Sequence, residues 1–369
     1  MKMIAIVTIS NSTNYGNRLQ NYALQNYILG LGCNPYTLIN LSSEFDNKVN
    51  YFKFILYYSK IFIKKILNLF KNIEVEKQRK LNFSIFDEKY IIFADDKINN
   101  NIKSFDKVLL NKFDYFVAGS DQIWNPQFLC NAEANYLYYV PSEKKVTYAP
   151  SFGMNYIPKN RVNEIKNYLM SYKNISVREE AGKEIIEDLI NKDNVEVLID
   201  PTMLLTAEDW NRILKKPIML KYKKYIFNYF LGDLSIDKKM EIERVARENN
   251  CEIINILDKN SPFYECGPSE FLYLEKNAFL ICTDSFHSSV FAIIYNRPFI
   301  IFDREEKNIS SMNSRLETLI NKFKLKNRKF EGKITKENLE HDYTEAYKIL
   351  EKERKKSEEF LKKALDINE

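Results

Sequence analysis

A short polar turn, TDSFHSS, contains one of only two histidines in the chain and is the first candidate for chemistry. Asp284, Ser285 and His287 lie between a predicted strand over Phe279–Cys282 and a predicted helix over Phe286–Asn296. The free N–H groups and the dipole of a helix N-terminus favour an anion. An imidazole beside them could donate to a phosphate or transfer a proton near neutral pH. The alternative is an ordinary capped helix, with Asp284 or Ser285 as N-cap and His287 as a satisfied surface group.

A second polar loop follows the predicted strand over Tyr115–Ala118 in the stretch DYFVAGSDQIWN. Ser120, Asp121 and Gln122 present polar groups there, and the Asp121 carboxylate is a candidate general base for a hydroxyl. The alternative for Asp121 is an Asx-turn that caps the following segment. Trp124 could stack on a sugar, although a packed indole is the more common role.

The motif ISVREE predicts a short strand over Ile175–Glu180 that leaves Arg178 near its end. A guanidinium in that place could bind a phosphate or a carboxylate through two parallel hydrogen bonds. The alternative is a salt bridge between Arg178 and either Glu179 or Asp200. Both interpretations predict a charged group at the edge of a sheet.

The polar loop SNSTNYGN lies between the first predicted strand, Met3–Ile9, and a helix predicted from about Arg18 to Leu31. Gly16 could permit a positive φ and Asn17 could cap the helix. The loop amides and the Arg18 side chain could hold an anionic or sugar ligand. An ordinary connection between strand and helix is the alternative.

Predicted strands and helices alternate in both halves of the chain, which is typical of α/β proteins with parallel sheets. The histidine helix leads into a strand over Pro298–Phe302, so that its polar turn reaches the carboxyl edge of a sheet, where open α/β folds bind ligands. We therefore expect two Rossmann-like domains facing across a cleft, with a junction near Tyr172. The expected division is residues 1–172, residues 173–335 and a C-terminal helix over 336–369.

Composition excludes several classes of protein. With 45% apolar and 28% charged residues among 369, the chain is globular rather than disordered. The net charge of +5 is mild and no basic stripe is separated from acids, so nucleic acid is not an expected partner. The five cysteines lack metal-ligand spacing, which predicts reduced thiols in a cytosol and no metal. The chain opens directly on a strand, so we expect no signal peptide, and no apolar run reaches the ~20 residues of a membrane span.

The segment Tyr51–Asn72 is strongly apolar and carries five lysines, at positions 53, 60, 64, 65 and 71. We expect a core helix with the lysines on its wet face, and the alternative is a helix lying in the plane of a lipid surface. Gln78–Tyr90 should continue as an amphipathic helix with Leu81, Ile85 and Phe86 turned inward.

Seven short motifs in sequence order resemble the polysaccharide pyruvyl transferase family over about Ile4 to Ile320: NYGNRLQNYAL, FDYFVAGSDQIWNP, ISVREE, LIDPTMLL, GPSEFLYL, TDSFHSSVFAIIYNRPFI and SRLETLI. The resemblance implies a GT-B-like fold of two Rossmann-like domains. Members that are enzymes transfer an enolpyruvyl-derived unit from phosphoenolpyruvate to a sugar of a cell-surface glycan, usually as a cyclic pyruvate ketal across two hydroxyls. That chemistry calls for an acid, a base and anion ligands rather than a metal, so no cofactor is expected.

The resemblance also implies roles for individual residues. Arg178 resembles the family's phosphoenolpyruvate-binding arginine, and His287 resembles its second-domain histidine, expected as phosphate ligand and acid. Asp121 resembles the acidic residue at the cleft and is the candidate base for the acceptor hydroxyl. The first domain would line the acceptor side through Asn14, Gly16, Asn17 and Arg18. Further substrate contacts are expected from Ser120, Gln122, Asp284, Ser285 and Ser288.

Two departures from the family pattern bear on these expectations. Ser288 stands where the family commonly has glycine after the histidine, so its side chain either narrows the approach of phosphate or adds a donor. The residues DSF stand where some members carry an arginine before the histidine. The anion site would then depend on Arg178 together with Arg18 or Arg304.

Two other functions are compatible with the same motifs. One is a GT-B glycosyltransferase that uses a nucleotide sugar, with Glu270 or Asp284 binding the ribose. The other is a non-catalytic glycan-assembly protein of the same fold. The expected partners are phosphoenolpyruvate and a glycan, nucleotide-linked or lipid-linked sugar acceptor. The expected location is the cytoplasm, with peripheral contact at the inner membrane face as an open alternative.

Overall fold

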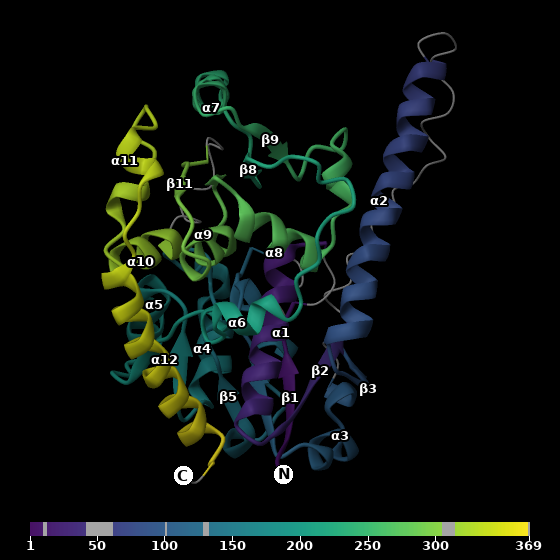
Figure 1. The fold of residues 1–369 in the computed structure, drawn as a ribbon. Helices are drawn as coiled ribbons and strands as arrows, with labels where there is room; N and C mark the ends of the chain where they lie inside the picture. The colour runs from purple at the N-terminus through teal and green to yellow at the C-terminus, as the bar shows by residue number, and fades with distance from the viewer. Residues whose placement is uncertain (10–12, 42–61, 100–101, 128–132, 305–313, 368–369) are drawn as a thin grey trace.

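A computed structural model describes the chain over residues 1–9, 13–41, 62–99, 102–127, 133–304 and 314–367, with the backbone alone over 62–72. Helices and strands alternate along these ranges, and every strand pair in them is parallel. The predicted α/β class with two Rossmann-like domains is confirmed. In Figure 1 one sheet lies in the lower half of the molecule and another in the upper half.

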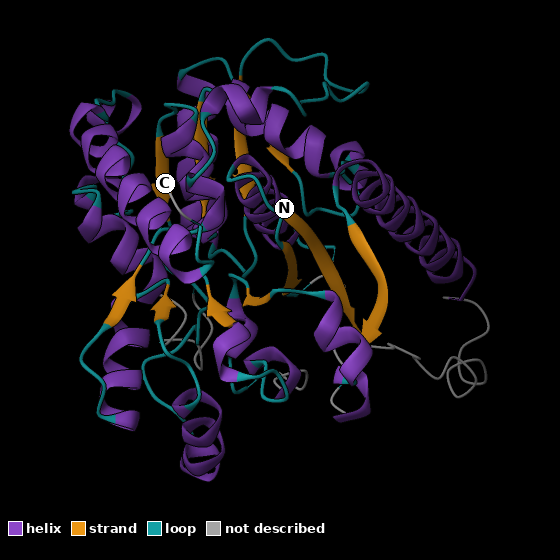
Figure 2. Ribbon diagram, turned by 90° about the horizontal axis from the view of Figure 1, so that it is seen from below, coloured by secondary structure: helices purple, strands orange, loops and turns teal. Residues whose placement is uncertain are grey.

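The first sheet has the strand order β3-β2-β1-β4-β5. Its strands are β1 (Met3–Val7), β2 (Asn34–Asn40), β3 (Phe93–Ile98), β4 (Tyr115–Ala118) and β5 (Lys145–Thr147). The helices of this part are α1 (Tyr15–Gly30), α2 (Phe62–Tyr90), α3 (Lys107–Lys112) and α4 (Val162–Met170). Successive residues of β1 enter different apolar clusters, Ile4 on one face and Ala5 on the other, because both faces of a parallel sheet are covered. Figure 2 shows helices packed along both sides of the strands.

Strands β6 (Ile175–Val177) and β7 (Val195–Val197) pair with each other, and β6 lies beside β5. Ser176 donates its backbone N–H to Thr147 Oγ1 at 2.6 Å, and Arg178 donates its backbone N–H to Pro150 O at 3.1 Å. Helix α5 (Glu180–Ile190) connects the two strands. The junction near residue 172 stays a prediction, and these contacts favour a junction after β7.

The second sheet has the order β11-β10-β8-β9. Its strands are β8 (Tyr225–Tyr229), β9 (Glu252–Asn255), β10 (Leu280–Thr283) and β11 (Phe299–Ile301). The helices of this part are α6 (Ala207–Asn211), α7 (Ile236–Glu248), α8 (Pro268–Asn277), α9 (Phe286–Ile294) and α10 (Ser314–Lys322). The predicted βαβ unit around the histidine is thus β10, α9 and β11, with β10 and β11 adjacent and parallel.

A shared apolar core joins the two halves. Tyr15 of α1 stacks on Phe271 of α8 with ring centroids 4.4 Å apart. Trp210 of α6 lies between the halves, with its ring 5.5 Å from Tyr22 of α1 and 5.0 Å from Phe291 of α9. Burial of aromatic rings on this scale fixes the two sheets relative to each other.

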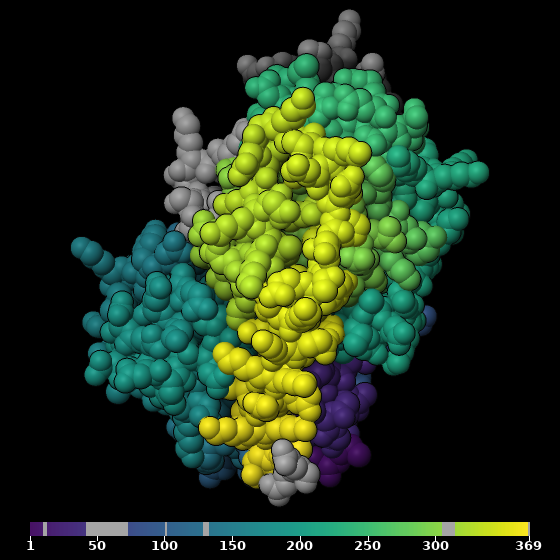
Figure 3. Space-filling model, turned by 60° about the vertical axis from the view of Figure 1, so that its left-hand side comes forward, coloured from purple at the N-terminus to yellow at the C-terminus, as the bar shows by residue number. Residues whose placement is uncertain are grey.

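The C-terminal part consists of α11 (Lys336–Leu339) and α12 (Thr344–Ala364), and α12 runs along both halves. Figure 3 shows this yellow helix crossing from the second half down to the purple N-terminal part. Tyr347 Oη donates to Ile293 O of α9 at 2.7 Å, whereas Lys2 Nζ donates to Leu365 O at 2.9 Å. The last helix therefore ties the second half back to the first strand.

Helix α2 differs from its prediction. Leu81 and Ile85 are 51% and 50% exposed, so their expected inward orientation is wrong, whereas Phe86 is buried as expected. The buried face instead contains Arg79, Phe83 and Phe86, which follow the spacing of one helix face. The predicted helix Tyr51–Asn72 lies outside the described residues up to position 61, and its remainder is the backbone of the first turns of α2.

Candidate functional site

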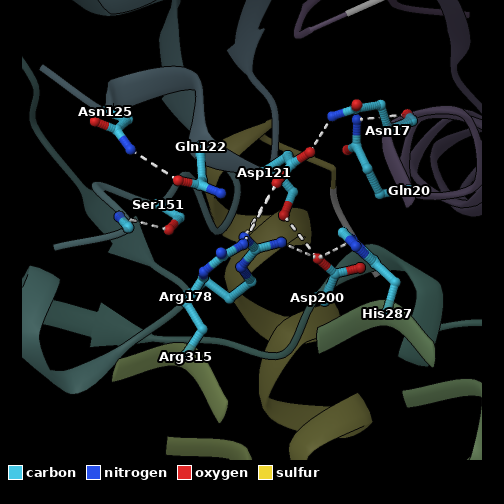
Figure 4. Close-up of polar contacts among 12 residues, drawn as sticks. Asn17, Gln20, Asp121, Gln122, Asn125, Ser151, Arg178, Asp200, His287 and Arg315 are labelled. Atoms are coloured by element: carbon cyan, nitrogen blue, oxygen red, sulfur yellow. Dashed lines mark hydrogen bonds and ion pairs between the residues drawn. The ribbon is translucent and has the colours of Figure 1, made fainter. Parts of the chain in front are cut away.

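Charged side chains from both halves meet where the two sheets face each other (Figure 4). Asp121 follows β4, Arg178 follows β6 and Asp200 follows β7, so all three lie at carboxyl ends of strands, as the parallel arrangement requires. His287 lies in the first turn of α9 and Arg315 in the first turn of α10. All five are at least 92% buried by residue. The predicted His287, Arg178 and Asp121 therefore belong to one cluster.

Asp200 lies at the centre of this cluster. Its Oδ2 accepts from Arg178 Nη1 at 2.6 Å and from Ser120 Oγ at 3.1 Å, and lies 3.5 Å from His287 Nε2. Its Oδ1 accepts from the Thr202 backbone N–H at 3.0 Å and the Thr202 hydroxyl at 2.7 Å. Burial would raise the pKa of Asp200, but His287, Arg178 and Thr202 outweigh burial and hold the pKa far below its ordinary value. Asp200 is therefore a permanent anion between the guanidinium and the imidazole.

Asp121 is held by both neighbouring elements. Its carboxylate accepts a hydrogen bond from Asn17 Nδ2 of α1, and its Oδ1 lies 3.2 Å from Arg178 Nη2 and 3.8 Å from Arg315 Nη1. Burial would raise its pKa, but Arg178, His287 and Arg315 outweigh burial and lower the pKa. Asp121 is therefore ionised at neutral pH and is a weak base in this arrangement.

The backbone at Asp121 is strained. Its φ of 70° and ψ of −173° lie in a region that essentially only glycine occupies. Such a residue costs about 1–3 kcal/mol and persists only where its surroundings determine it. Here the Ser151 N–H donates to Asp121 O at 2.8 Å, and Arg178 holds the carboxylate. Strain of this kind concentrates at functional sites, which supports a role for this loop beyond turn formation.

Arg178 is already engaged by two carboxylates. Of the alternatives left open by its sequence position, the salt bridge with Asp200 is present. Burial would lower the pKa of Arg178, but Asp200, Asp121 and Glu179 outweigh burial and raise it. Glu179 itself turns away, because its Oε1 accepts from Ser151 Oγ at 2.8 Å. The guanidinium also lies over the Phe286 ring, 4.6 Å from its centroid, which fixes its plane.

Arg315 was not singled out from sequence, although it lies in the motif SRLETLI. Its side chain is buried, and its closest carboxylate contact is the 3.8 Å separation from Asp121. Burial and the neighbouring Arg178 lower its pKa to about 10, so it remains protonated at neutral pH. The Gln122 amide oxygen accepts from Asn125 Nδ2 at 2.8 Å, and the opposite amide orientation would turn an oxygen to Arg315 Nη2 at 2.8 Å. Arg315 is thus the more loosely paired arginine of the cluster.

Comparison with known proteins decides the family. The family model for polysaccharide pyruvyl transferase matches residues 14–306, a range that contains Asp121, Arg178, Asp200 and His287. The chain belongs to this family. The resemblance to this family is thereby confirmed, and with it a transferase of polysaccharide biosynthesis; six of the seven motifs lie within the matched range, and SRLETLI, at residues 314–320, lies beyond it. No curated protein sequence matches the chain.

Two of the solved structures that are similar to this member of the pyruvyl transferase family are UDP-N-acetylglucosamine 2-epimerases. UDP-N-acetylglucosamine 2-epimerase from Rickettsia bellii is similar with a TM-score of 0.50 and 14% identity, over 99% of this chain and 97% of that one. UDP-GlcNAc 2-epimerase from Neisseria meningitidis bound to UDP-GlcNAc is similar with a TM-score of 0.47 and 12% identity, over the whole of both chains. Identity this low supports the GT-B fold alone.

The start of α1 corrects three predictions. The helix begins at Tyr15 rather than near Arg18, and Asn14 is its N-cap, with Asn14 Oδ1 accepting from the Asn17 backbone N–H at 3.3 Å. Asn17 therefore does not cap the helix, and its side chain reaches Asp121 instead. Gly16 is helical and is not among the described residues with positive φ, so the expected left-handed conformation is wrong.

Arg18 and Arg304, proposed as supporting cations, are both paired elsewhere. Arg18 Nε lies 2.9 Å from Asp87 Oδ1 of α2. Burial raises the pKa of Asp87 to about 6 although Arg18 opposes the shift. Arg304 Nε donates to Asp284 Oδ2 at 2.8 Å. Arg315 is therefore the second arginine beside Arg178 in this cluster.

Two other polar residues near His287, Asp284 and Ser288, have structural partners. Asp284 accepts from the backbone N–H groups of Leu231 and Gly232, each at 2.8 Å, and so holds that loop. Ser285 is the N-cap residue of α9 without a side-chain hydrogen bond to the helix. Ser288, which departs from the family pattern, donates to Glu275 Oε1 of α8 at 2.5 Å. Its hydroxyl is thus directed to a buried acid of the second half.

The structure also places two residues that were considered for sugar binding, Trp124 and Glu270. Trp124 is fully buried and stacks on Tyr136 with centroids 5.3 Å apart, so it is a packed indole and not a sugar platform. Glu270, considered for ribose, lies 2.6 Å from Lys215 Nζ. Within the described ranges, the structure contains no cluster of three His, Cys, Asp or Glu side chains that could hold a metal ion.

Proposed function

We propose that this protein transfers a pyruvyl group from phosphoenolpyruvate to two hydroxyls of a sugar in a cell-surface glycan or its precursor, forming a cyclic pyruvate ketal. Membership of the polysaccharide pyruvyl transferase family supports this proposal. The observation that carries it is the convergence of His287, Arg178 and Arg315 from three separate segments. Such a set offers one proton donor and two anion ligands to a donor that carries both a carboxylate and a phosphate.

Charge balance indicates how the anionic donor would be accepted. The positive charges of Arg178 and Arg315 are offset by the carboxylates of Asp121 and Asp200. A phosphate group therefore enters favourably only if His287 is protonated or if one ion pair is exchanged. The Arg315–Asp121 pair, at 3.8 Å, is the longest and is the one we expect to be exchanged. In this proposal Arg315 exchanges Asp121 for the donor, whereas Arg178 keeps its ion pairs with Asp121 and Asp200 and contributes positive charge beside the donor.

The reaction balances without a further reactant. His287 protonates the methylene carbon of phosphoenolpyruvate, and the first sugar hydroxyl forms a bond to C2. The C2–O bond to phosphate then breaks, and the second hydroxyl takes its place to close the ketal. The two hydroxyls release two protons in this sequence. One returns to His287 and replaces the proton given to the methylene carbon, and the other is carried away by inorganic phosphate. General acid catalysis of this kind typically contributes ~10²–10⁴-fold.

Asp121 was predicted as the base for the acceptor hydroxyl. Because its pKa is lowered, its carboxylate is better suited to accept a hydrogen bond from that hydroxyl than to keep its proton. We propose that Asp121 orients the acceptor and that Ser120, Gln122 and Asn17 support the loop from which it acts. The Asn17–Asp121 hydrogen bond links this role to α1.

The test is release of inorganic phosphate from phosphoenolpyruvate across a panel of lipid-linked and nucleotide-linked sugars, with mass spectrometry of the product. We expect phosphate release that depends on the acceptor and a product heavier by one pyruvate ketal. Titration calorimetry with UDP-GlcNAc is the control for a nucleotide-sugar transferase. Binding of UDP-GlcNAc without binding of phosphoenolpyruvate would refute the proposal.

We further propose that the protein acts in the cytoplasm and meets lipid-linked acceptors at the inner membrane face. The support is the sequence 51–72, with five lysines and no acid, next to a helix α2 whose first turns extend beyond the body of the molecule in Figure 1. Within the described residues, no helix is long and apolar enough to cross a bilayer. Flotation with anionic vesicles, compared for the full chain and a chain lacking residues 51–61, tests this contact.

A further inference from the structure

Gly16 lies against the imidazole of His287. The two residues belong to different halves, since Gly16 is in the first turn of α1 and His287 in the first turn of α9. A Cβ atom built on Gly16 would lie 2.1 Å from His287 Nδ1, 2.5 Å from Cγ and 2.6 Å from Cε1. Separations below 3.0 Å do not occur between real atoms of this kind, so no other residue fits here without movement.

The imidazole has little freedom to move away from such a side chain. Its Nε2 lies 3.5 Å from Asp200 Oδ2, and the ring of Phe286 meets it edge-on with centroids 5.3 Å apart. The residue is 6% exposed. A displaced ring would lose its position beside Asp200, and a displaced α1 would pull Asn17 away from Asp121.

We propose that Gly16 is a positioning residue for His287. The missing side chain lets the first turn of α1 lie against the ring, so that the first half sets the place of a proton donor that the second half supplies. The role in catalysis rests on the proposed pyruvyl transfer, whereas the contact itself does not. This role differs from both earlier expectations for Gly16, because it requires neither a positive φ nor contact with the acceptor.

The same helix supplies a matched control. Gly30 is the last residue of α1, and a Cβ atom built on it meets nothing within 4 Å. Alanine in a helix is normally more stabilising than glycine. Gly30→Ala should therefore leave the thermal midpoint unchanged or raise it. Gly16→Ala should instead lower the thermal midpoint. Opposite changes in the midpoint for the two substitutions would attribute the loss at position 16 to the clash with His287.

A double-mutant cycle with His287→Ala attributes the effect to the imidazole. Removing the ring removes the atoms that the new methyl group would meet, so adding Gly16→Ala to His287→Ala should not lower the midpoint further. Equal destabilisation by Gly16→Ala in both backgrounds would overturn the inference. This measurement needs no substrate, so it decides the contact even if the protein does not use phosphoenolpyruvate.

Kinetics then separates positioning from folding. At a temperature where Gly16→Ala remains folded by circular dichroism, kcat for phosphate release should fall ~100-fold or more, as for loss of an acid–base group. The KM for phosphoenolpyruvate should change less than kcat, and Gly30→Ala should keep both constants. A kcat within threefold of the unaltered protein would overturn the positioning role. Absence of phosphate release from the unaltered protein would instead refute the proposed function.

Discussion

Replacing Asp200 with asparagine is the most direct test of the charge network, because the side chain keeps its shape and loses its charge. The asparagine oxygen could still accept from Thr202, but Arg178 would keep only Asp121, at 3.2 Å. Removing one partner of a buried ion pair costs about 3–5 kcal/mol. We expect the lower end, roughly 3 kcal/mol in the free energy of unfolding, because Asp121 still compensates part of the charge.

The stability lost in Asp200→Asn should depend on pH, and the lowered pKa of Asp200 determines in which direction. The pKa of Asp200 is lower in the folded protein than its ordinary value of 3.8. Its stabilising contribution is therefore fully present above pH 3.8 and is lost as pH falls below that value. Since one pKa unit corresponds to about 1.4 kcal/mol, the difference between the two proteins should be roughly 1 kcal/mol smaller at pH 3 than at pH 7.

The assay is urea unfolding followed by circular dichroism at pH 7 and pH 3. Asp303→Asn is the matched control, because that side chain is exposed and should change stability by no more than about 0.5 kcal/mol. A loss below about 1 kcal/mol at pH 7 for Asp200→Asn would refute the reasoning from buried ion pairs. A loss that stays constant between the two pH values would refute the assignment of an ionised Asp200.

Three further substitutions test separate parts of the site. His287→Ala should lower the rate of phosphate release ~10²–10⁴-fold, whereas His341→Ala, which removes the other histidine, should change it less than threefold. Arg315→Ala should raise the KM for phosphoenolpyruvate by roughly 10-fold to 100-fold, since it removes a charged hydrogen bond. Burial raises the pKa of Glu275 above its ordinary value of 4.5. The stability that depends on its neutral form is therefore fully present below pH 4.5 and is lost as the pH rises through the raised pKa. Glu275→Gln should therefore gain stability relative to the unaltered protein as the pH rises from 5 to 7, measured by urea unfolding, and a difference that stays constant would contradict this.

Most strands and helices followed from local pattern. Strand β4 has the predicted bounds, and α9 and β11 lie within two residues of theirs. Strand β3, FADDKI, was not predicted because two adjacent acids interrupt its apolar alternation. In α2 the apolar residues Leu81 and Ile85 suggested the wrong buried face, since the burial of Arg79 depends on partners outside the helix. Arg79 Nη1 donates to Tyr15 Oη at 2.8 Å and to Tyr264 O at 2.7 Å.

The sequence by itself shows which residue types stand at the ends of predicted strands and at the starts of predicted helices. That information was enough to select Asp121, Arg178 and His287, because polar residues after an apolar strand are conspicuous in the sequence. It was not enough to find Arg315 or the central place of Asp200, because nothing in sequence spacing indicates which strand ends face each other across the two sheets. The packing of α1 on the second half, with Gly16 close to His287 of α9, decided that, and with it the reason for a glycine at position 16. A periodic pattern indicates which face of an element can be buried, whereas partners distant in sequence are fixed only when the shared core brings the two halves together.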